Sequence, residues 1–302
     1  MLGLGKSRPV PEHEAEGEIE RVYHEIRQTL RVTGVNLNFR TWAAYEKFLP
    51  AMWDAVRPNA QTRAFEDAAD GLREQAVRSS EGLGRLGAAS ALALGESQRY
   101  HIRGALDLYH YVNPKLLLLT SAVRLSLQGE PIGEGDGRAA PEERIEPGPP
   151  GAMHSMEMES EKPKDKTVRA LFGDITRTLA LSSINSDYRT LALWPDYLDA
   201  AWARIKPIIG RDEYRRSADS LRDRARALAR ALPHPIPLTA ERLGELGEDV
   251  GGIQETTERF ERLLPGLILN VALFSLDWRT PEELVRSPFP AAASRLIRGG
   301  IR

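Results

Sequence analysis

The sequence predicts an all-α protein made of two homologous helical halves that pack as a pseudo-dimer and are joined by a long linker. Residues Ile26 to Ala76 align with Ile175 to Ala225 at a constant offset of 149 without a gap, and 16 of the 51 pairs are identical. Chance would give about 3 to 5 identities. Apolar residues recur three and four positions apart through nearly the whole chain, and no segment alternates long enough to be a strand. Because two copies are too few for a repeat array, we expect paired halves with a ligand cleft between them.

Four helices are expected in each half. Their ranges are 17–31, 40–57, 61–78 and 97–127, then 166–181, 187–205, 211–231 and 250–276. We expect Ile26 to superpose on Ile175, and Trp53 and Trp202 to occupy equivalent packed positions. At the break 232–239, proline stops one helix and Thr239 caps the next.

The aligned copies also define the predicted domains. We assign the first helical repeat to residues 1–128 and the second to residues 167–302. Residues 129–166 are dense in glycine, proline and charge, which is typical of a flexible surface linker.

The composition excludes several classes of function. The 41 basic and 43 acidic residues are interspersed and the formal net charge is −2, so nothing favours nucleic acid or an anionic membrane as a partner. The absence of cysteine excludes disulfides and thiol chemistry. The six histidines lack the spacing of metal-ligand motifs, so we expect neither a metal nor a cofactor. There is no apolar signal core and no apolar run of membrane length, and we expect a cytoplasmic protein.

The two copies differ at a turn that can carry chemistry. The first copy has Asn38 where the second has Asp187, so a neutral amide has become a carboxylate. At the start of a predicted helix the free N–H groups and the helix dipole favour an anion, and the pKa of Asp187 should stay at or below about 3.9. Asp187 would then be ionised at neutral pH and able to accept a proton from water. The alternative is that Asp187 only caps the helix, as we expect for Asn38.

Two further features distinguish the halves. Thr62 and Glu66, four apart on one helix face, correspond to Arg211 and Arg215 in the second copy. Asn113 precedes a proline, which should restrict it to an extended or turn conformation, break the helix and aim the amide inward. The alternative for Thr62 and Glu66 is that they are exposed helix residues that vary without consequence. The alternative for Asn113 is that it is an ordinary turn residue.

Separated segments of the chain resemble the group I 2-haloacid dehalogenases, cofactor-independent enzymes that act on both enantiomers of 2-halocarboxylic acids. The resemblance covers most of the chain, and the matching segments include GEIERVYHEIRQTLRV, TRAFEDAADGLRE, YVNPKLLLL, SDYRTLALWP and SPFP. It implies an all-helical fold of two related halves joined by a long linker, and it suggests a homodimer.

The resemblance also implies roles for individual residues. Asp187 would deprotonate a water that Asn113 orients, and the water would attack the carbon bearing the halogen, with inversion and without a covalent enzyme ester. Ser186 and backbone N–H groups at the helix start would bind the substrate carboxylate. Thr62 and Glu66 match a threonine and a glutamate implicated in the activity of the family.

The chain departs from the family in the walls of the pocket. The family lines its pocket with aromatic side chains, whereas the matching positions here are Gly34, Leu37 and Thr257. We expect all three to border the cavity that contains Asp187, and we expect a roomier or differently shaped pocket.

Two functions of different class remain open, and a third is excluded. The first is a hydrolase of the 2-haloacid dehalogenase type. The second is a paralogue of the same fold that binds or acts on another small carboxylate, because a fold does not determine a function. Release of halide from a panel of 2-haloacids separates these two. Helical proteins of the alkylhydroperoxidase type are excluded because their chemistry needs cysteine thiols.

Overall fold

The computed structural model describes residues 8–133 and 143–294, and within these residues the fold is all-α, as predicted. The first helices are η1 (Glu12–Glu14), α1 (Gly17–Leu30), α2 (Leu37–Trp42), α3 (Phe48–Ala60), α4 (Arg63–Leu83), η2 (Ala89–Ala91) and α5 (Glu96–Leu127). The later helices are α6 (Lys166–Thr178), α7 (Ser186–Leu191), α8 (Pro195–Ile209), α9 (Asp212–Arg230), α10 (Ala240–Glu245), α11 (Val250–Ser275) and α12 (Pro281–Leu284). The only β-pairing in the described residues consists of two isolated bridges.

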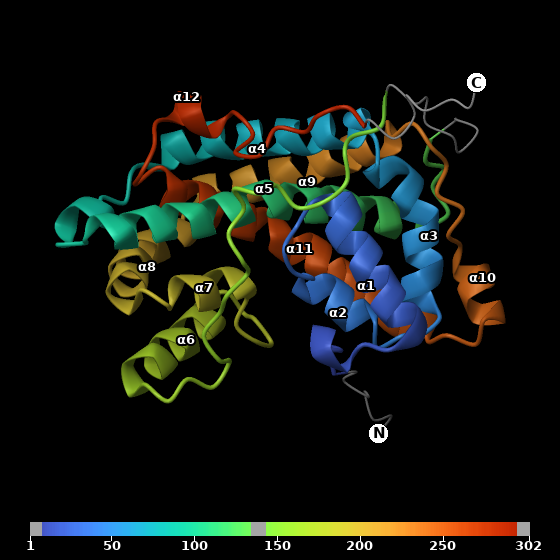
Figure 1. The fold of residues 1–302 in the computed structure, drawn as a ribbon, viewed down its shortest axis with the longest axis horizontal. Helices are drawn as coiled ribbons and strands as arrows, with labels where there is room; N and C mark the ends of the chain where they lie inside the picture. The colour runs from blue at the N-terminus through green and yellow to red at the C-terminus, as the bar shows by residue number, and fades with distance from the viewer. Residues whose placement is uncertain (1–7, 134–142, 295–302) are drawn as a thin grey trace.

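The long helices α4, α5, α9 and α11 form the centre of the molecule. Helices α1–α3 lie at one side of them and α6–α8 at the other (Figure 1). The most extensive contact between any two helices joins α5 to α11, and α4 and α9 pack against both. We call α1–α5 the N-terminal half and α6–α12 the C-terminal half. In the described residues, no helix is both long enough and apolar enough to cross a membrane.

Two of the predicted helices are each divided in the structure. The range 40–57 contains the end of α2 and most of α3, and the range 187–205 contains α7 and most of α8. In both halves a proline lies in the first turn of the later helix, Pro50 in α3 and Pro195 in α8. Proline is accepted there because the first N–H groups of a helix have no partner within it. The short helices α2 and α7 therefore end separately, and their N-termini can face the centre of the molecule.

The prediction that the proline after Asn113 breaks the helix is wrong. Helix α5 is continuous from Glu96 to Leu127 with Pro114 inside it, and α11 likewise contains Pro265. An interior proline costs a helix about 3 kcal/mol. Nearly every residue of α5 after Ala105 is buried, so tertiary packing outweighs this local cost. Asn113 consequently projects from a rigid helix rather than from a turn.

The two tryptophans predicted to be equivalent have matching surroundings. Both are buried, and each donates an indole hydrogen bond to a carboxylate 28 residues earlier in the chain. Trp53 donates to Glu25 at 2.9 Å and Trp202 donates to Asp174 at 2.8 Å. The donors and the acceptors are both separated by the offset of the sequence alignment.

The described parts of the predicted linker, 129–166, contact both halves. On one side the Thr33 hydroxyl donates to the His154 carbonyl at 2.9 Å, and on the other the Thr190 hydroxyl donates to the Glu157 carbonyl at 2.7 Å. The central part of the predicted linker lies outside the described residues. The segment that follows it thus crosses between the halves in hydrogen-bonded contact with each.

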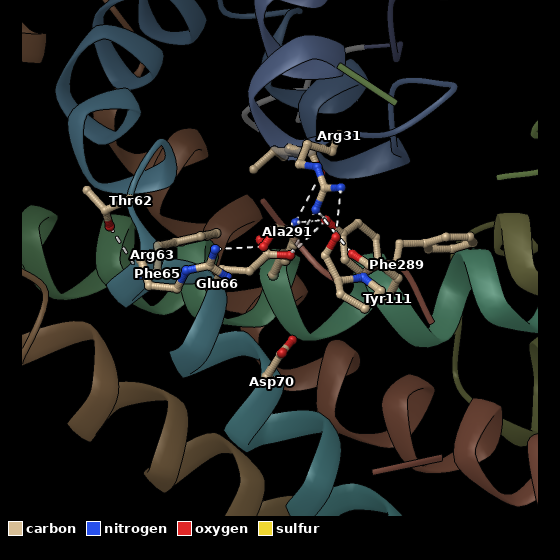
Figure 2. Close-up of polar contacts among 12 residues, drawn as sticks. Arg31, Thr62, Arg63, Phe65, Glu66, Asp70, Tyr111, Phe289 and Ala291 are labelled. Atoms are coloured by element: carbon tan, nitrogen blue, oxygen red, sulfur yellow. Dashed lines mark hydrogen bonds and ion pairs between the residues drawn. The ribbon is translucent and has the colours of Figure 1, made fainter. Parts of the chain in front are cut away.

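A buried ionic cluster lies between α1, α4 and α5 (Figure 2). It consists of Arg31, Glu66, Tyr111 and Lys115, and we call it the Glu66 cluster. The Lys115 ammonium lies 2.7 Å from one Glu66 oxygen, and the Tyr111 hydroxyl donates to the other at 2.8 Å. The Arg31 guanidinium lies 3.5 Å from Glu66 and donates to Tyr111 at 2.9 Å. Burial lowers the pKa of Lys115 to about 8, although the Glu66 carboxylate opposes this shift.

The Glu66 cluster also fixes the C-terminal segment. Arg31 donates to the Phe289 carbonyl at 3.1 Å, and Arg63 on α4 donates to the Ala291 carbonyl at 2.6 Å (Figure 2). One carboxylate therefore compensates two buried cations, and one of those cations anchors a segment more than 250 residues away in sequence.

Replacing Glu66 should destabilise the fold strongly. Glu66→Gln leaves the Arg31 and Lys115 charges buried without a carboxylate, and breaking a buried ion pair in this way costs about 3–5 kcal/mol. Urea denaturation measures the free energy of unfolding. Glu74→Gln is the matched control on α4, because its ion pair with Arg78 is exposed and should be worth about 1 kcal/mol or less. Equal losses in the two variants would show that the Glu66 cluster does not support the fold.

Candidate active site

Asp187 and Asn113 meet between the two halves. Asp187 is the second residue of α7, and Asn113 lies in the middle of α5. The Asn113 amide donates to a carboxylate oxygen of Asp187 at 2.7 Å. The two residues are 1% and 3% exposed, so the hydrogen bond is shielded from solvent. An acid and an amide from opposite halves thus form one buried unit.

A small cavity of about 30 Å³ borders this pair. That volume accommodates one or two water molecules. Its walls come from equivalent positions in the two halves, the turn residues 36–38 and 185–187. Asn113 and Leu116 of α5, and Phe260, Leu263, Leu264 and Leu267 of α11, complete the lining. The cavity therefore has one polar end, at Asp187, and a mainly apolar remainder.

The expectation of a low pKa for Asp187 is wrong. Burial raises the pKa of Asp187 from 3.8 to about 6, and the hydrogen bond from Asn113 opposes this shift only in part. The turn predicted to favour the anion is removed from water by α5 and α11, and desolvation dominates. A carboxylate with this pKa is ionised at neutral pH and is a better proton acceptor than an exposed aspartate.

The expectation that Asn38 caps a helix is also wrong. The N-cap of α2 is Asn36, and the Asn38 side chain makes no capping hydrogen bond. Both polar atoms of the Asn38 amide are buried and lack a hydrogen-bond partner in the described residues. Buried amides without partners are uncommon in proteins. Because Asn38 lines the cavity, its amide is available to a molecule that occupies it.

The structure brings together some of the predicted site residues and separates others. Ser186 and Leu37 line the cavity with Asp187 and Asn113. Thr257 does not line it, although it is buried on α11 one turn before a lining residue, with its hydroxyl bonded to the Ile253 carbonyl.

Gly34 is buried next to the linker rather than at the cavity. A Cβ atom added to Gly34 would lie 3.2 Å from the Cβ of Met156. Met156 therefore occupies the space into which a larger side chain at position 34 would extend.

Thr62 and Glu66 lie apart from the cavity. Thr62 is the N-cap of α4, and its hydroxyl accepts a hydrogen bond from the Phe65 backbone N–H at 3.1 Å. Glu66 is engaged in the Glu66 cluster. Neither side chain borders the space around Asp187.

Sequence reasoning missed the wall that α11 contributes. Aligning VNPKL in α5 with LLPGL in α11, at an offset of 151, pairs Asn113 with Leu264 and Leu116 with Leu267. That alignment would have pointed to Leu264 and Leu267, two of the four α11 residues in the wall. Phe260 supplies one aromatic ring to the cavity and makes an edge contact with Trp42 at 6.1 Å between ring centroids.

The geometry permits proton transfer within a mainly apolar enclosure. Asp187 can accept a proton, Asn113 fixes the plane of its carboxylate, and Asn38 and Ser186 offer further hydrogen bonds. In the described part of the chain, no three His, Asp or Glu side chains are grouped so that they could hold a metal ion.

Comparison with known proteins gives a consistent result. The profile of the family described as halocarboxylic acid dehydrogenase DehI matches residues 33–188. The (R)-2-haloacid dehalogenase of Pseudomonas putida is 33% identical over 288 residues, which span 88% of this chain and 91% of that protein. A configuration-inverting 2-haloacid dehalogenase of Pseudomonas sp. (strain 113) is 32% identical, over 93% of this chain and 94% of that protein.

Solved structures agree in fold. A D-2-haloacid dehalogenase mutant in complex with D-2-CPA has a TM-score of 0.79 and 28% sequence identity to this chain. The match covers 90% of this chain and 96% of the chain of that mutant. The complex of a D-2-haloacid dehalogenase with L-LA gives the same values. The chain therefore belongs to the 2-haloacid dehalogenase family of enzymes, which cleave carbon–halide bonds.

Proposed function

We propose that this protein hydrolyses 2-halocarboxylic acids by direct attack of a water molecule that Asp187 deprotonates. The observation that carries the proposal is the buried Asn113–Asp187 hydrogen bond at the edge of a cavity of about 30 Å³, which has room for that water. Descriptions of the relatives as 2-haloacid dehalogenases supply the substrate class.

The reaction needs one base and no covalent intermediate. The water oxygen forms a bond to the carbon that bears the halogen, and the carbon–halogen bond breaks with its electron pair leaving on the halide. The proton of the water passes to Asp187. Attack opposite to the leaving group inverts the configuration, which is the outcome for the configuration-inverting 2-haloacid dehalogenase of Pseudomonas sp. (strain 113).

Asn113 orients the base, and other cavity residues orient the substrate. By holding one oxygen of Asp187, Asn113 leaves the second oxygen free to bind water. The hydroxyl and backbone N–H of Ser186 and the unpaired amide of Asn38 bind the substrate carboxylate. Such positioning in an enclosed site accounts for much of the rate gain in enzymes.

Residues outside the cavity have indirect roles in this proposal. Thr62 and Glu66 affect activity through the positions of α4 and α5, Gly34 through its contact with Met156 of the linker, and Thr257 through its place on α11. Of the three positions that lack the aromatic rings of the family pocket, Leu37 lines the cavity, and a leucine there favours a substrate of different shape. The alternative is a paralogue that acts on another small carboxylate, and halide release from a panel of 2-haloacids separates the two.

The pseudo-dimer is part of the same proposal, with repeats at residues 1–128 and 167–302, a homodimeric assembly and a cytoplasmic location. The two non-glycine residues of the described chain with positive φ support the repeat. They are Arg31, with φ of 60°, and Ala180, with φ of 51°, and they are separated by the offset of 149. Left-handed backbone is unfavourable for such residues, so its recurrence at equivalent positions indicates a shared backbone.

Replacing the base should abolish most of the activity. Asp187→Asn keeps the size of the side chain and removes the proton acceptor, so kcat for halide release from 2-chloropropionate should fall by at least about 10². Asp196→Asn, in the exposed first turn of α8, is the matched control and should retain wild-type turnover. Adding Asn38→Asp to Asp187→Asn should not restore activity, because position 264 offers leucine instead of asparagine. Full turnover by Asp187→Asn would contradict the mechanism.

The Asp187→Asn variant should be more stable than the wild type above pH 6. The pKa of Asp187 is about 6 in the folded state, and its ordinary value is 3.8. Protonation of Asp187 therefore stabilises the folded state fully below about pH 4, and this stabilisation is lost as the pH rises through 6. Two pKa units correspond to about 3 kcal/mol of unfolding free energy. Urea denaturation at pH 4 and pH 8 tests this expectation. A wild type that is more stable than Asp187→Asn at pH 8 would show that the buried carboxylate is not strained by desolvation.

The pH dependence of the reaction should report Asp187. Because the base must be deprotonated, kcat/KM should rise with pH to a plateau with an apparent pKa near 6. Asn113→Leu removes the hydrogen bond that lowers this pKa, so its profile should move to higher pH. A flat profile between pH 4 and pH 8, or a shift of the Asn113 variant to lower pH, would contradict the assignment.

A further inference from the structure

A second and larger cavity lies in the C-terminal half beside the catalytic one. It has a volume of about 420 Å³ and is lined by the end of α6 and parts of α7, α9 and α11. Asn185, Leu263 and Leu267 line both cavities. The two spaces are therefore neighbours whose walls share these side chains. We call the larger one the arginine pocket, after Arg215, Arg222 and Arg262 in its wall.

The wall of the arginine pocket carries excess positive charge. Besides the three arginines, Asp219 is the only acidic residue in the lining, and it pairs with Arg222 at 2.9 Å. Arg215 pairs with Asp212, which lies outside the lining. Within the described residues, Arg262 makes no ion pair with an acidic side chain. The Arg262 guanidinium in the wall of the pocket is thus available for an anion.

Two long side chains of the Glu66 cluster have small counterparts in the C-terminal half. Ala180 is the counterpart of Arg31 at the offset of 149, and Gly266 is the counterpart of Lys115 at the offset of 151 in the paired α5 and α11 segments. Arg215 stands in the place of Glu66. The N-terminal half fills this region with the Glu66 cluster, whereas the C-terminal half leaves it open and reverses the sign of the central charge.

The matching arginines of the two halves show the same difference. Arg73 and Arg222 are identical at the offset of 149, and each pairs with the aspartate three residues earlier. The side chain of Arg73 is 0% exposed and that of Arg222 is 30% exposed. The arginine of the pair is therefore fully buried in one half and partly exposed beside the pocket in the other.

A chain of hydrogen bonds connects the lining of the arginine pocket to the residue next to Asp187. The Tyr214 hydroxyl donates to the Asn270 side-chain oxygen at 2.8 Å, and the Asn270 amide donates to the Tyr188 hydroxyl at 2.8 Å. Tyr188 directly follows Asp187. A Cβ added to Gly266 would lie 3.1 Å from the Tyr214 hydroxyl, so a larger residue at this position would press on that hydroxyl.

We propose that the arginine pocket is an antechamber that binds small carboxylate anions and passes the 2-halocarboxylate to the catalytic cavity past Leu263 and Leu267. This inference rests on the proposed function for the nature of the anion. The catalytic cavity has room for little more than water, so the substrate must enlarge it on arrival, and the leucines that both cavities share are the side chains that must move. A positive pocket at that point raises the local concentration of an anionic substrate.

The test compares two double variants with the same change in net charge. Arg215→Glu with Arg262→Glu reverses the charge of the arginine pocket. Arg216→Glu with Arg224→Glu is the control, because both residues are exposed on α9 and neither lines the pocket. Arg216 has an acidic partner three residues away, as Arg215 does, so the control also matches the loss of an exposed pair.

For the pocket variant, kcat/KM for 2-chloropropionate at low salt should fall at least about tenfold, within the 10–10³ range of electrostatic attraction. Its kcat at saturating substrate should remain within twofold of the wild type, and its kcat/KM should lose the dependence on salt concentration. The control variant should keep the wild-type values. Equal kcat/KM in the two variants, or a fall in kcat of the pocket variant alone, would overturn the proposal.

Calorimetric titration with propionate, an unreactive carboxylate, tests the pocket without turnover. Binding should weaken at least tenfold in the pocket variant and remain unchanged in the control. If the wild type releases no halide from any 2-haloacid, the proposed function fails, and propionate binding still decides whether the arginine pocket takes carboxylates. Equal propionate affinity in both variants would overturn the proposed role of the arginine pocket, and the proposed role of Asp187 would stand.

Discussion

The contact between α5 and α11 is the interaction on which the rest of the structure depends. One helix comes from each half, and their packing is the most extensive in the molecule. It places Asn113 within hydrogen-bond distance of Asp187 on α7, and it covers that carboxylate with Leu263, Leu264 and Leu267. The same packing keeps both helices continuous through an internal proline. Loss of this contact would expose Asp187 to water, and its pKa would return toward the ordinary value.

Two buried carboxylates illustrate how surroundings decide the role of the same chemical group. Glu66 lies against a lysine, an arginine and a tyrosine hydroxyl, so its charge is compensated and it joins α1, α4, α5 and the C-terminal segment. Asp187 has the neutral Asn113 amide and a backbone N–H as its hydrogen-bond donors, and no cation lowers its pKa. Its charge is therefore costly to bury, and uptake of a proton relieves that cost. A compensated carboxylate stabilises the structure, and an uncompensated one is available for chemistry.

The features predicted well from the sequence are those that depend on local pattern or on the repeat. Helical periodicity predicts the fold class, and the matched settings of Trp53 and Trp202 follow from the alignment. The features predicted wrongly depend on tertiary packing. The course of α5 through Pro114 and the raised pKa of Asp187 both result from burial by distant helices, and neither leaves a local signal. The position of Gly34 against Met156 likewise depends on how the linker folds back, which its composition does not specify.

The central claim is that the oxygen transferred to the product comes directly from water that Asp187 deprotonates. A single turnover of 2-chloropropionate, with enzyme in excess and in water enriched in oxygen-18, measures this directly. The account predicts that the hydroxyl group of the lactate formed carries the label in the first turnover and that the Asp187 carboxylate remains unlabelled. An unlabelled product hydroxyl, with the label recovered in Asp187 by mass spectrometry after further turnovers, would show that the carboxylate attacks the substrate itself and would contradict the account.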